Sequence, residues 1–206
     1  IVPLIALYAG FVAAEYGDLV DTWATLNEPF ATTLSGYLLP GEDRSAPPGV
    51  SMNGPAVVAT LQHQIEGHAA MVDALRAHDA ADADGDGVAV QAGLVLNFTA
   101  ITPADPADPD DVEAAARCDY LYHRVFLDAI TSGAWDDDLD GAADRTRDEL
   151  ADRLDWLGIN YYNQLFVTST SITILPEVPA SRFIPSFSWD PYPEGMAQVV
   201  GVAQEY

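Results

Sequence analysis

A carboxylate and an amide stand side by side at the end of a short apolar run. Asn27 and Glu28 follow residues 20–26, which lie between Gly17 and Pro29. Such a run predicts a strand, and proline cannot continue its hydrogen-bonded ladder. Barrel enzymes place their catalytic side chains just past the C-terminal ends of parallel strands. The position makes Glu28 a candidate catalytic carboxylate, although the position alone favours the alternative of an ordinary glutamate at a strand end.

The elements that would position these residues alternate between helix and strand along the chain. This alternation predicts an α/β fold with a parallel sheet. The predicted strands cover residues 20–26, 88–97 and 156–162. The predicted helices begin near residues 1, 54, 109 and 193, and the third of them runs to about residue 132. A short acidic helix is predicted just before the last strand. Residues 30–54 are predicted to form a loop rich in glycine and proline.

The sequence predicts the buried faces and the ends of two helices. The first is predicted to be amphipathic and to stop at Gly17, with one face made of Leu4, Leu7, Tyr8, Phe11 and Val12. The second has a predicted buried stripe made of Val58, Leu61, Ile65, His68, Val72 and Leu75. Asn53 or Gly54 is its expected N-cap, and Asp108 is the expected N-cap of the helix that follows the next strand.

Four segments resemble, in order, motifs of the retaining β-glycosidases of glycoside hydrolase family 1, the β-glucosidase family. They are Thr25–Pro29 (Thr-x-Asn-Glu-Pro), Gly93–Asn97 (the fifth strand), Trp156–Tyr162 (the sixth strand) and Ser188–Met196 (Trp-x-x-Tyr-Pro-Glu-Gly). The resemblance implies a (β/α)8 TIM barrel, which needs eight strands and about 250 residues. Residues 1–206 are therefore expected to form a partial TIM-barrel domain, incomplete at both ends, with about strands four to six and their helices.

The resemblance also implies roles for individual residues. Glu28 would be the general acid/base, and Asn27 would hydrogen-bond the sugar 2-hydroxyl. Asn97 would lie near the reducing-side sugar, unless it only satisfies loop backbone at the end of its strand. Tyr162 would hold the nucleophile through its hydroxyl, with Asn160 on the same face and Tyr161 packed outward. The alternative for Tyr162 is a core aromatic.

The chain lacks the motif that carries the family's nucleophile, the glutamate of Ile/Val-Thr-Glu-Asn-Gly. Glu194 does not replace it, because a helix-start acid explains its place. The isolated chain is therefore predicted to be inactive, and the remainder of the barrel, in the same or a second chain, is its expected partner. The complete enzyme would need no cofactor and would cleave a small β-glycoside or disaccharide. The alternative is a non-catalytic carbohydrate-binding or structural fragment that needs a complementary chain.

Composition limits the other partners. The chain has 206 residues, 49% of them hydrophobic, which is enough for a domain with a core. Its 32 acidic and 8 basic residues, all of the latter arginine, give a net charge of -24. Such a surface repels nucleic acid and anionic membranes, so neither is expected as a main partner. No apolar span reaches membrane length, and the apolar N-terminus does not resemble a signal peptide.

Metal and thiol chemistry have weaker support. Asp82–Gly87 resembles the first half of a calcium loop, but position twelve is Gly93 instead of glutamate, which favours a solvated acidic loop. His63 and His68 are five residues apart, whereas zinc ligands on one helical face are four apart, and His68 is expected to be a core histidine. Cys118 is the single cysteine and is expected to be a buried thiol.

Overall fold

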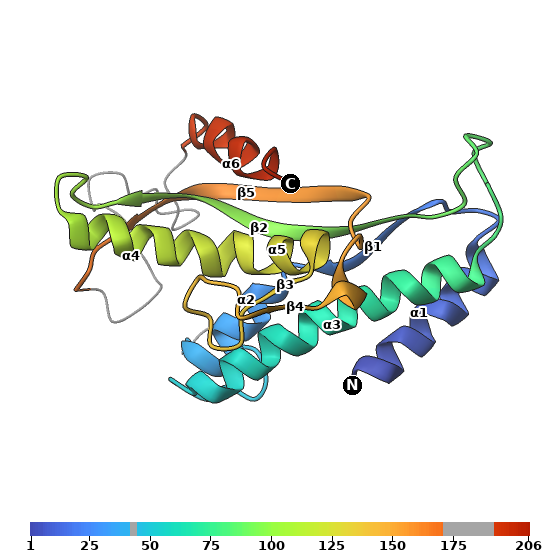
Figure 1. The fold of residues 1–206 in the computed structure, drawn as a ribbon, viewed down its shortest axis with the longest axis horizontal. Helices are drawn as coiled ribbons and strands as arrows, with labels where there is room; N and C mark the ends of the chain where they lie inside the picture. Colours follow the sequence, from blue (N-terminus) through green and yellow to red (C-terminus); the bar gives the residue numbers. More distant parts are fainter. Residues whose placement is uncertain (42–44, 171–191) are drawn as a thin grey trace. The chain divides into compact units, whose positions relative to one another are not determined.

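The computed structural model describes residues 1–41, 45–170 and 192–206 (Figure 1). Helices and strands alternate along the chain, as predicted. They are α1 (Val2–Tyr16), β1 (Thr22–Asn27), α2 (Pro29–Thr33), the π-helical turn η1 (Leu34–Leu38), α3 (Gly54–His78), β2 (Gln91–Pro103), α4 (Pro109–Asp119), the π-helical turn η2 (Tyr120–Arg124), α5 (Val125–Ser132), β3 (Ala134–Trp135), β4 (Arg145–Thr146), the 3-10 turn η3 (Asp148–Leu150), β5 (Trp156–Val167) and α6 (Gly195–Ala203).

The described residues form a three-stranded sheet in the order β1-β2-β5, and β1 pairs with β2 in parallel. The chain passes from β1 to β2 through α2, η1 and α3, which is the crossover that a parallel pair requires (Figure 1). Gly93 of β2 allows a close approach, because a Cβ atom there would lie 2.3 Å from the ring of Trp156. The short antiparallel hairpin of β3 and β4 was not predicted from the sequence.

The chain divides into two compact units. The first contains residues 1–96, 126–138 and 143–158, and the second contains residues 97–125, 139–142 and 159–206. The boundary crosses β2 and β5, so each unit holds one end of these two strands.

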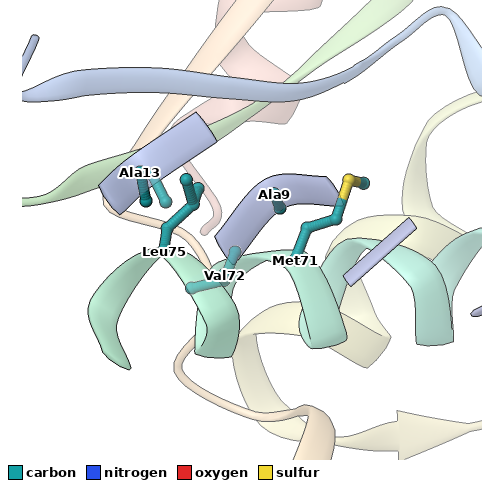
Figure 2. Packing of buried hydrophobic residues seen from close by; sticks show 6 residues of the cluster. Ala9, Ala13, Met71, Val72 and Leu75 are labelled. Atoms are coloured by element: carbon teal, nitrogen blue, oxygen red, sulfur yellow. The ribbon is translucent and has the colours of Figure 1, made fainter. Parts of the chain in front are cut away.

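The first unit is built on the packing of α1 against α3 (Figure 2). Ala9 and Ala13 of α1 lie against Met71, Val72 and Leu75 of α3, and all five are buried. Small side chains on α1 let the two helices approach closely.

The prediction of an amphipathic α1 is therefore wrong. Leu4, Leu7, Tyr8 and Phe11 are 60–71% exposed, and the buried face is the one that carries Ala9 and Ala13. Apart from Glu15 near its end, helix α1 is apolar on all sides, so sequence periodicity could not tell which face packs.

The predicted stripe of α3 is largely confirmed. Leu61, Ile65, His68, Val72 and Leu75 are buried, whereas Val57 is buried in place of Val58. The N-cap is also as predicted, because the side chain of Asn53 accepts a hydrogen bond from the amide of Ala56.

In the second unit, His123 of η2 is fully buried against β2. Its ring stacks on Phe98 at 4.6 Å, its Nε2 accepts the amide N–H of Thr99, and its Nδ1 lies 2.8 Å from Asp119. The predicted helix over residues 109–132 is present as α4, η2 and α5, and the Asp108 side chain caps it through the amide of Asp110.

Several predicted boundaries differ from the structure. Strand β2 begins at Gln91 and continues six residues past Asn97, and β5 continues to Val167, because apolar β-formers extend both runs. The predicted loop over residues 30–54 contains α2 and η1, where Phe30 and Thr33 are buried. Residues 188–191 of the motif Ser188–Met196 lie outside the described residues.

Every arginine in the described part of the chain makes an ion pair. The pairs are Arg76–Asp155, Arg117–Glu113, Arg124–Asp119, Arg145–Asp137, Arg147–Glu66 and Arg153–Asp73. Acidic residues far outnumber these cations, so the negative excess that the composition indicates remains.

Among the described residues, no helix combines the length and the apolar character that crossing a membrane requires.

The same substitution on the two helices tests the corrected packing of α1. In the isolated chain, Leu75→Ala should lower the free energy of unfolding by about 2–5 kcal/mol, because it leaves a cavity in the core. Leu7→Ala, at a 71% exposed position, should change it by less than about 0.5 kcal/mol. Urea denaturation measures both values, and a large loss for Leu7→Ala would contradict the packing in Figure 2.

Candidate active site

Glu28 lies directly after β1 with a left-handed backbone. Its φ and ψ angles are 48° and 53°, a conformation that costs an ordinary residue about 1–2 kcal/mol. Two hydrogen bonds hold it there: its amide donates to the carbonyl of Val95 at 2.8 Å, and its carbonyl accepts from Ala31 at 3.0 Å. Strained residues of this kind cluster at functional sites and persist where the surrounding structure fixes them.

A bulge in β1 precedes Glu28. Ala24 pairs with Gly93 and Asn27 pairs with Val95, so β1 has one residue more than β2 between these two pairs. Bulges bend a strand and redirect side chains, and they are common next to active sites. The bulge sets the direction in which the exposed Asn27 and the half-buried Glu28 leave the sheet.

His68 ties β1 to the rest of the first unit. Its Nδ1 lies 2.6 Å from the hydroxyl of Thr25, and its Nε2 lies 2.7 Å from the carbonyl of Arg153. Burial lowers the pKa of His68 to about 4, so the ring is neutral at pH 7. Because a carbonyl can only accept, Nε2 carries the proton and Nδ1 accepts from Thr25. The prediction of a core histidine with satisfied hydrogen bonds is confirmed.

Asn97 lies within β2 and belongs to the second unit. It does not end its strand, so the alternative that it satisfies loop backbone at a strand end is wrong. Its Oδ1 is buried and has no hydrogen-bond partner among the described residues. A buried acceptor without a donor is costly unless another group supplies one.

Tyr162 lies in the part of β5 that belongs to the second unit and is 41% exposed. Its neighbour Tyr161 donates its hydroxyl to the carbonyl of Tyr192, just before α6. The two rings therefore have different surroundings, as alternation along a strand predicts. The structure places Asn27 and Glu28 next to each other in the first unit, and Asn97 and Tyr162 in the second.

Gln64 is a residue that sequence reasoning missed. It lies one turn before His68 on α3, and its side chain contacts Pro29 and Thr33, just after Glu28. The one available signal was the spacing of four residues between two polar side chains on a buried helix face.

The acidic loop over Asp82–Gly87 closes on itself. Asp82 accepts the amides of Gly85 and Gly87, and Asp21 accepts those of Ala83 and Asp84. Asp21, Asp82 and Asp84 bring one carboxylate oxygen each within 4.8 Å of the others. Their carboxylates already serve as caps for backbone N–H groups.

Burial raises the pKa of the Cys118 thiol to about 12, as expected for an inert thiol.

Comparison with solved structures defines the fold. The chain matches the family 1 b-glucosidase from Thermotoga maritima with a TM-score of 0.80 at 21% identity, covering 99% of this chain and 45% of that one. The β-glycosidase from Thermosphaera aggregans gives a TM-score of 0.76 at 23% identity, covering 99% and 40%. The chain has the fold of part of a (β/α)8 barrel, with about strands four to six and their helices.

The sequence comparisons give the family. The model of glycosyl hydrolase family 1 matches residues 1–182, and the chain belongs to that family. A β-galactosidase from Pyrococcus woesei is 30% identical over 98% of this chain and 43% of its own length. Beta-glucosidase 4 from Oryza sativa subsp. japonica is 31% identical over 81% and 34%. The chain spans less than half the length of these relatives, and the resemblance inferred from the motifs is confirmed.

Replacing Glu28 tests the left-handed backbone. Glycine adopts this conformation without strain and alanine does not, so the Glu28→Gly chain should be about 1 kcal/mol more stable than the Glu28→Ala chain. At the exposed Glu15 of α1, which has a helical backbone, the order should be reversed, with glycine less stable than alanine. Urea denaturation measures the four variants, and the same order at both positions would count against the geometry.

Lowering the pH tests the neutral state of His68. The unfolded chain takes up a proton near pH 6.5, whereas the folded chain does so only near pH 4. Stability due to His68 is therefore complete above about pH 6.5 and falls by up to about 3 kcal/mol as the pH drops to 4.

The measurement is the difference in unfolding free energy between the unmodified chain and the His68→Gln variant. This difference should shrink between pH 7 and pH 4 by about the same 3 kcal/mol. His63→Gln, at an exposed position on the same helix, is the control for loss of a histidine. A constant difference for His68→Gln would show that the ring is not held neutral.

Proposed function

We propose that this chain supplies the general acid/base of a retaining β-glycosidase that removes terminal β-linked sugars from small glycosides or disaccharides. Glu28 is the acid/base carboxyl, and Asn27, Asn97 and Tyr162 contact the sugar or the nucleophile. The observation that carries the proposal is the fixed, left-handed Glu28 after the bulge of β1, in a chain that belongs to glycosyl hydrolase family 1.

The chemistry needs two carboxyl groups about 5–5.5 Å apart. One attacks the anomeric carbon, while the other protonates the leaving oxygen and later removes a proton from the incoming water. Glu28 performs the second task, because its place after a parallel strand corresponds to the rim where barrel enzymes act. The first task belongs to a glutamate outside these 206 residues, since the sequence lacks the nucleophile motif.

Asn97 supports a polar ligand in the second unit. Its buried Oδ1 accepts no hydrogen bond within the described chain, and a sugar hydroxyl would supply the missing donor. The matched Thermotoga maritima β-glucosidase has been solved with deoxynojirimycin and with glucoimidazole, two sugar-like ligands. A sugar substrate for this chain is consistent with those complexes.

The partner is the remainder of the barrel, in the same or a second polypeptide. The exposed apolar face of α1, formed by Leu4, Leu7, Tyr8 and Phe11, is a large patch to leave in water. In the described sheet, β1 and β5 are the outer strands, and an outer strand is where a further strand can pair. Covering both features requires additional strands and helices of the same fold.

The missing nucleophile motif supports a second function. A fragment with an acid/base site but no nucleophile can serve as a carbohydrate-binding or structural part that needs a complementary chain. The two functions differ in one outcome, which is whether turnover appears when the missing strands are supplied.

Mixing the chain with a polypeptide that supplies the missing strands distinguishes the catalytic function from the non-catalytic one. The isolated chain should release no nitrophenol from p-nitrophenyl β-glucoside, whereas a mixture with a polypeptide that carries the nucleophile motif should do so. Glu28→Gln should then lower kcat/KM by about 100- to 10,000-fold, because it removes general acid/base catalysis.

Glu15→Gln, the same change on the exposed surface of α1, is the matched control and should retain activity. Turnover by the isolated chain that depends on Glu28 would overturn the division of the two carboxyl groups. A mixture that binds the glucoside without cleaving it would favour the non-catalytic function.

A further inference from the structure

Two side chains of α3 contact the chain on both sides of Glu28. Gln64 and His68 are four residues apart, so they lie on the same face of the helix. His68 contacts Thr25, three residues before Glu28, and Gln64 contacts Pro29 and Thr33, one and five residues after it. All of these residues belong to the first unit.

Gln64 makes two hydrogen bonds with the segment after Glu28. Its Nε2 donates to the carbonyl of Pro29 at 2.9 Å, and its Oε1 accepts the hydroxyl of Thr33 at 3.0 Å. Thr33 is fully buried, so its hydroxyl depends on this protein partner. One amide side chain therefore fixes the first turn of α2 through both of its polar atoms.

His68 fixes the segment before Glu28. The neutral ring accepts the Thr25 hydroxyl at Nδ1 and donates to the Arg153 carbonyl at Nε2. Because both nitrogens are used and the ring is fully buried, Thr25 cannot shift without leaving a buried polar atom unpaired.

We propose that Gln64 and His68 form a clamp that positions Glu28 for proton transfer. A left-handed glutamate persists only where neighbouring groups over-determine its backbone, and the clamp supplies contacts on either side of it. Both are positioning residues, since they act through Thr25, Pro29 and Thr33. The catalytic consequence rests on the function proposed above, whereas the structural consequence does not.

Hydrogen exchange of the isolated chain tests the clamp without any activity. Gln64→Met removes both hydrogen bonds at nearly constant volume. The amides of Glu28 and Ala31, which are bonded to Val95 and Glu28, should then exchange about five- to tenfold faster. The amide of Val72, farther along α3, should keep its rate, which separates local loosening from global unfolding.

Gln62→Met is the matched control, because Gln62 has the same side chain on the same helix but reaches the carbonyl of Asp137 instead. It should leave the Glu28 and Ala31 amides unchanged. The contact of His68 with Thr25 is tested in the same way by comparing Thr25→Val with Thr22→Val, because Thr22 is exposed on the same strand. If the Glu28 and Ala31 amides exchange at the same rate in the two variants of each matched pair, the clamp is overturned.

Two substrates with different leaving groups, given to the complemented protein, distinguish misplacement of Glu28 from a loss of folded protein. Dinitrophenolate departs without protonation, whereas phenolate needs a well-placed acid. Gln64→Met should lower kcat/KM for phenyl β-glucoside about tenfold and leave that for dinitrophenyl β-glucoside within about twofold.

An equal fall for both substrates would show a loss of folded protein and would overturn the positioning role. If no active mixture forms, the proposed function fails, and the exchange rates of the Gln64 and Gln62 variants still decide whether the clamp exists.

Discussion

The hydrogen bonds of one neutral imidazole connect the parts of the first unit on which the candidate site depends. His68 joins α3 to β1 through Thr25, and to the segment before β5 through the carbonyl of Arg153. A hydroxyl, a carbonyl and the two nitrogens of a fully buried ring are thereby satisfied. The position of α3 also determines where α1 packs and where Gln64 meets α2. Loss of this contact would leave several buried polar groups without partners, so its effect would extend beyond the ring itself.

Sequence reasoning succeeded where the signal is local. The alternation of helices and strands, the stripe and cap of α3, and the family motif around Glu28 all follow from short patterns. It failed for α1, because alanine and leucine faces are both apolar and only the partner helix decides between them. The bulge in β1, the left-handed Glu28 and the contacts of Gln64 also lack a local pattern, since bonds to distant residues create them.

The large acidic excess has a structural use in the loops. Asp21 is buried and accepts two amides of the loop after α3, and Asp111 accepts the amides of Asp105 and Ser169. The amide of Ser169 is the main reason why the pKa of Asp111 lies below its usual range. Carboxylates thus replace backbone carbonyls as acceptors where the chain turns irregularly. Only some of the acidic groups are needed to balance arginine, and others organise the connections between elements.

Pro29 limits the conformations open to the residue before it. A proline ring disfavours the right-handed helical region at the preceding position and favours extended backbone, so the left-handed Glu28 departs from the preferred region. The hydrogen bonds of its amide to Val95 and of its carbonyl to Ala31 hold it there. With the main chain settled in this way, the carboxyl group moves only by rotation about the bonds of its own side chain. In the acid/base role proposed for Glu28, the carboxyl gives a proton and later takes one back, and it can do both with one backbone conformation, so little conformational entropy is lost between the two steps.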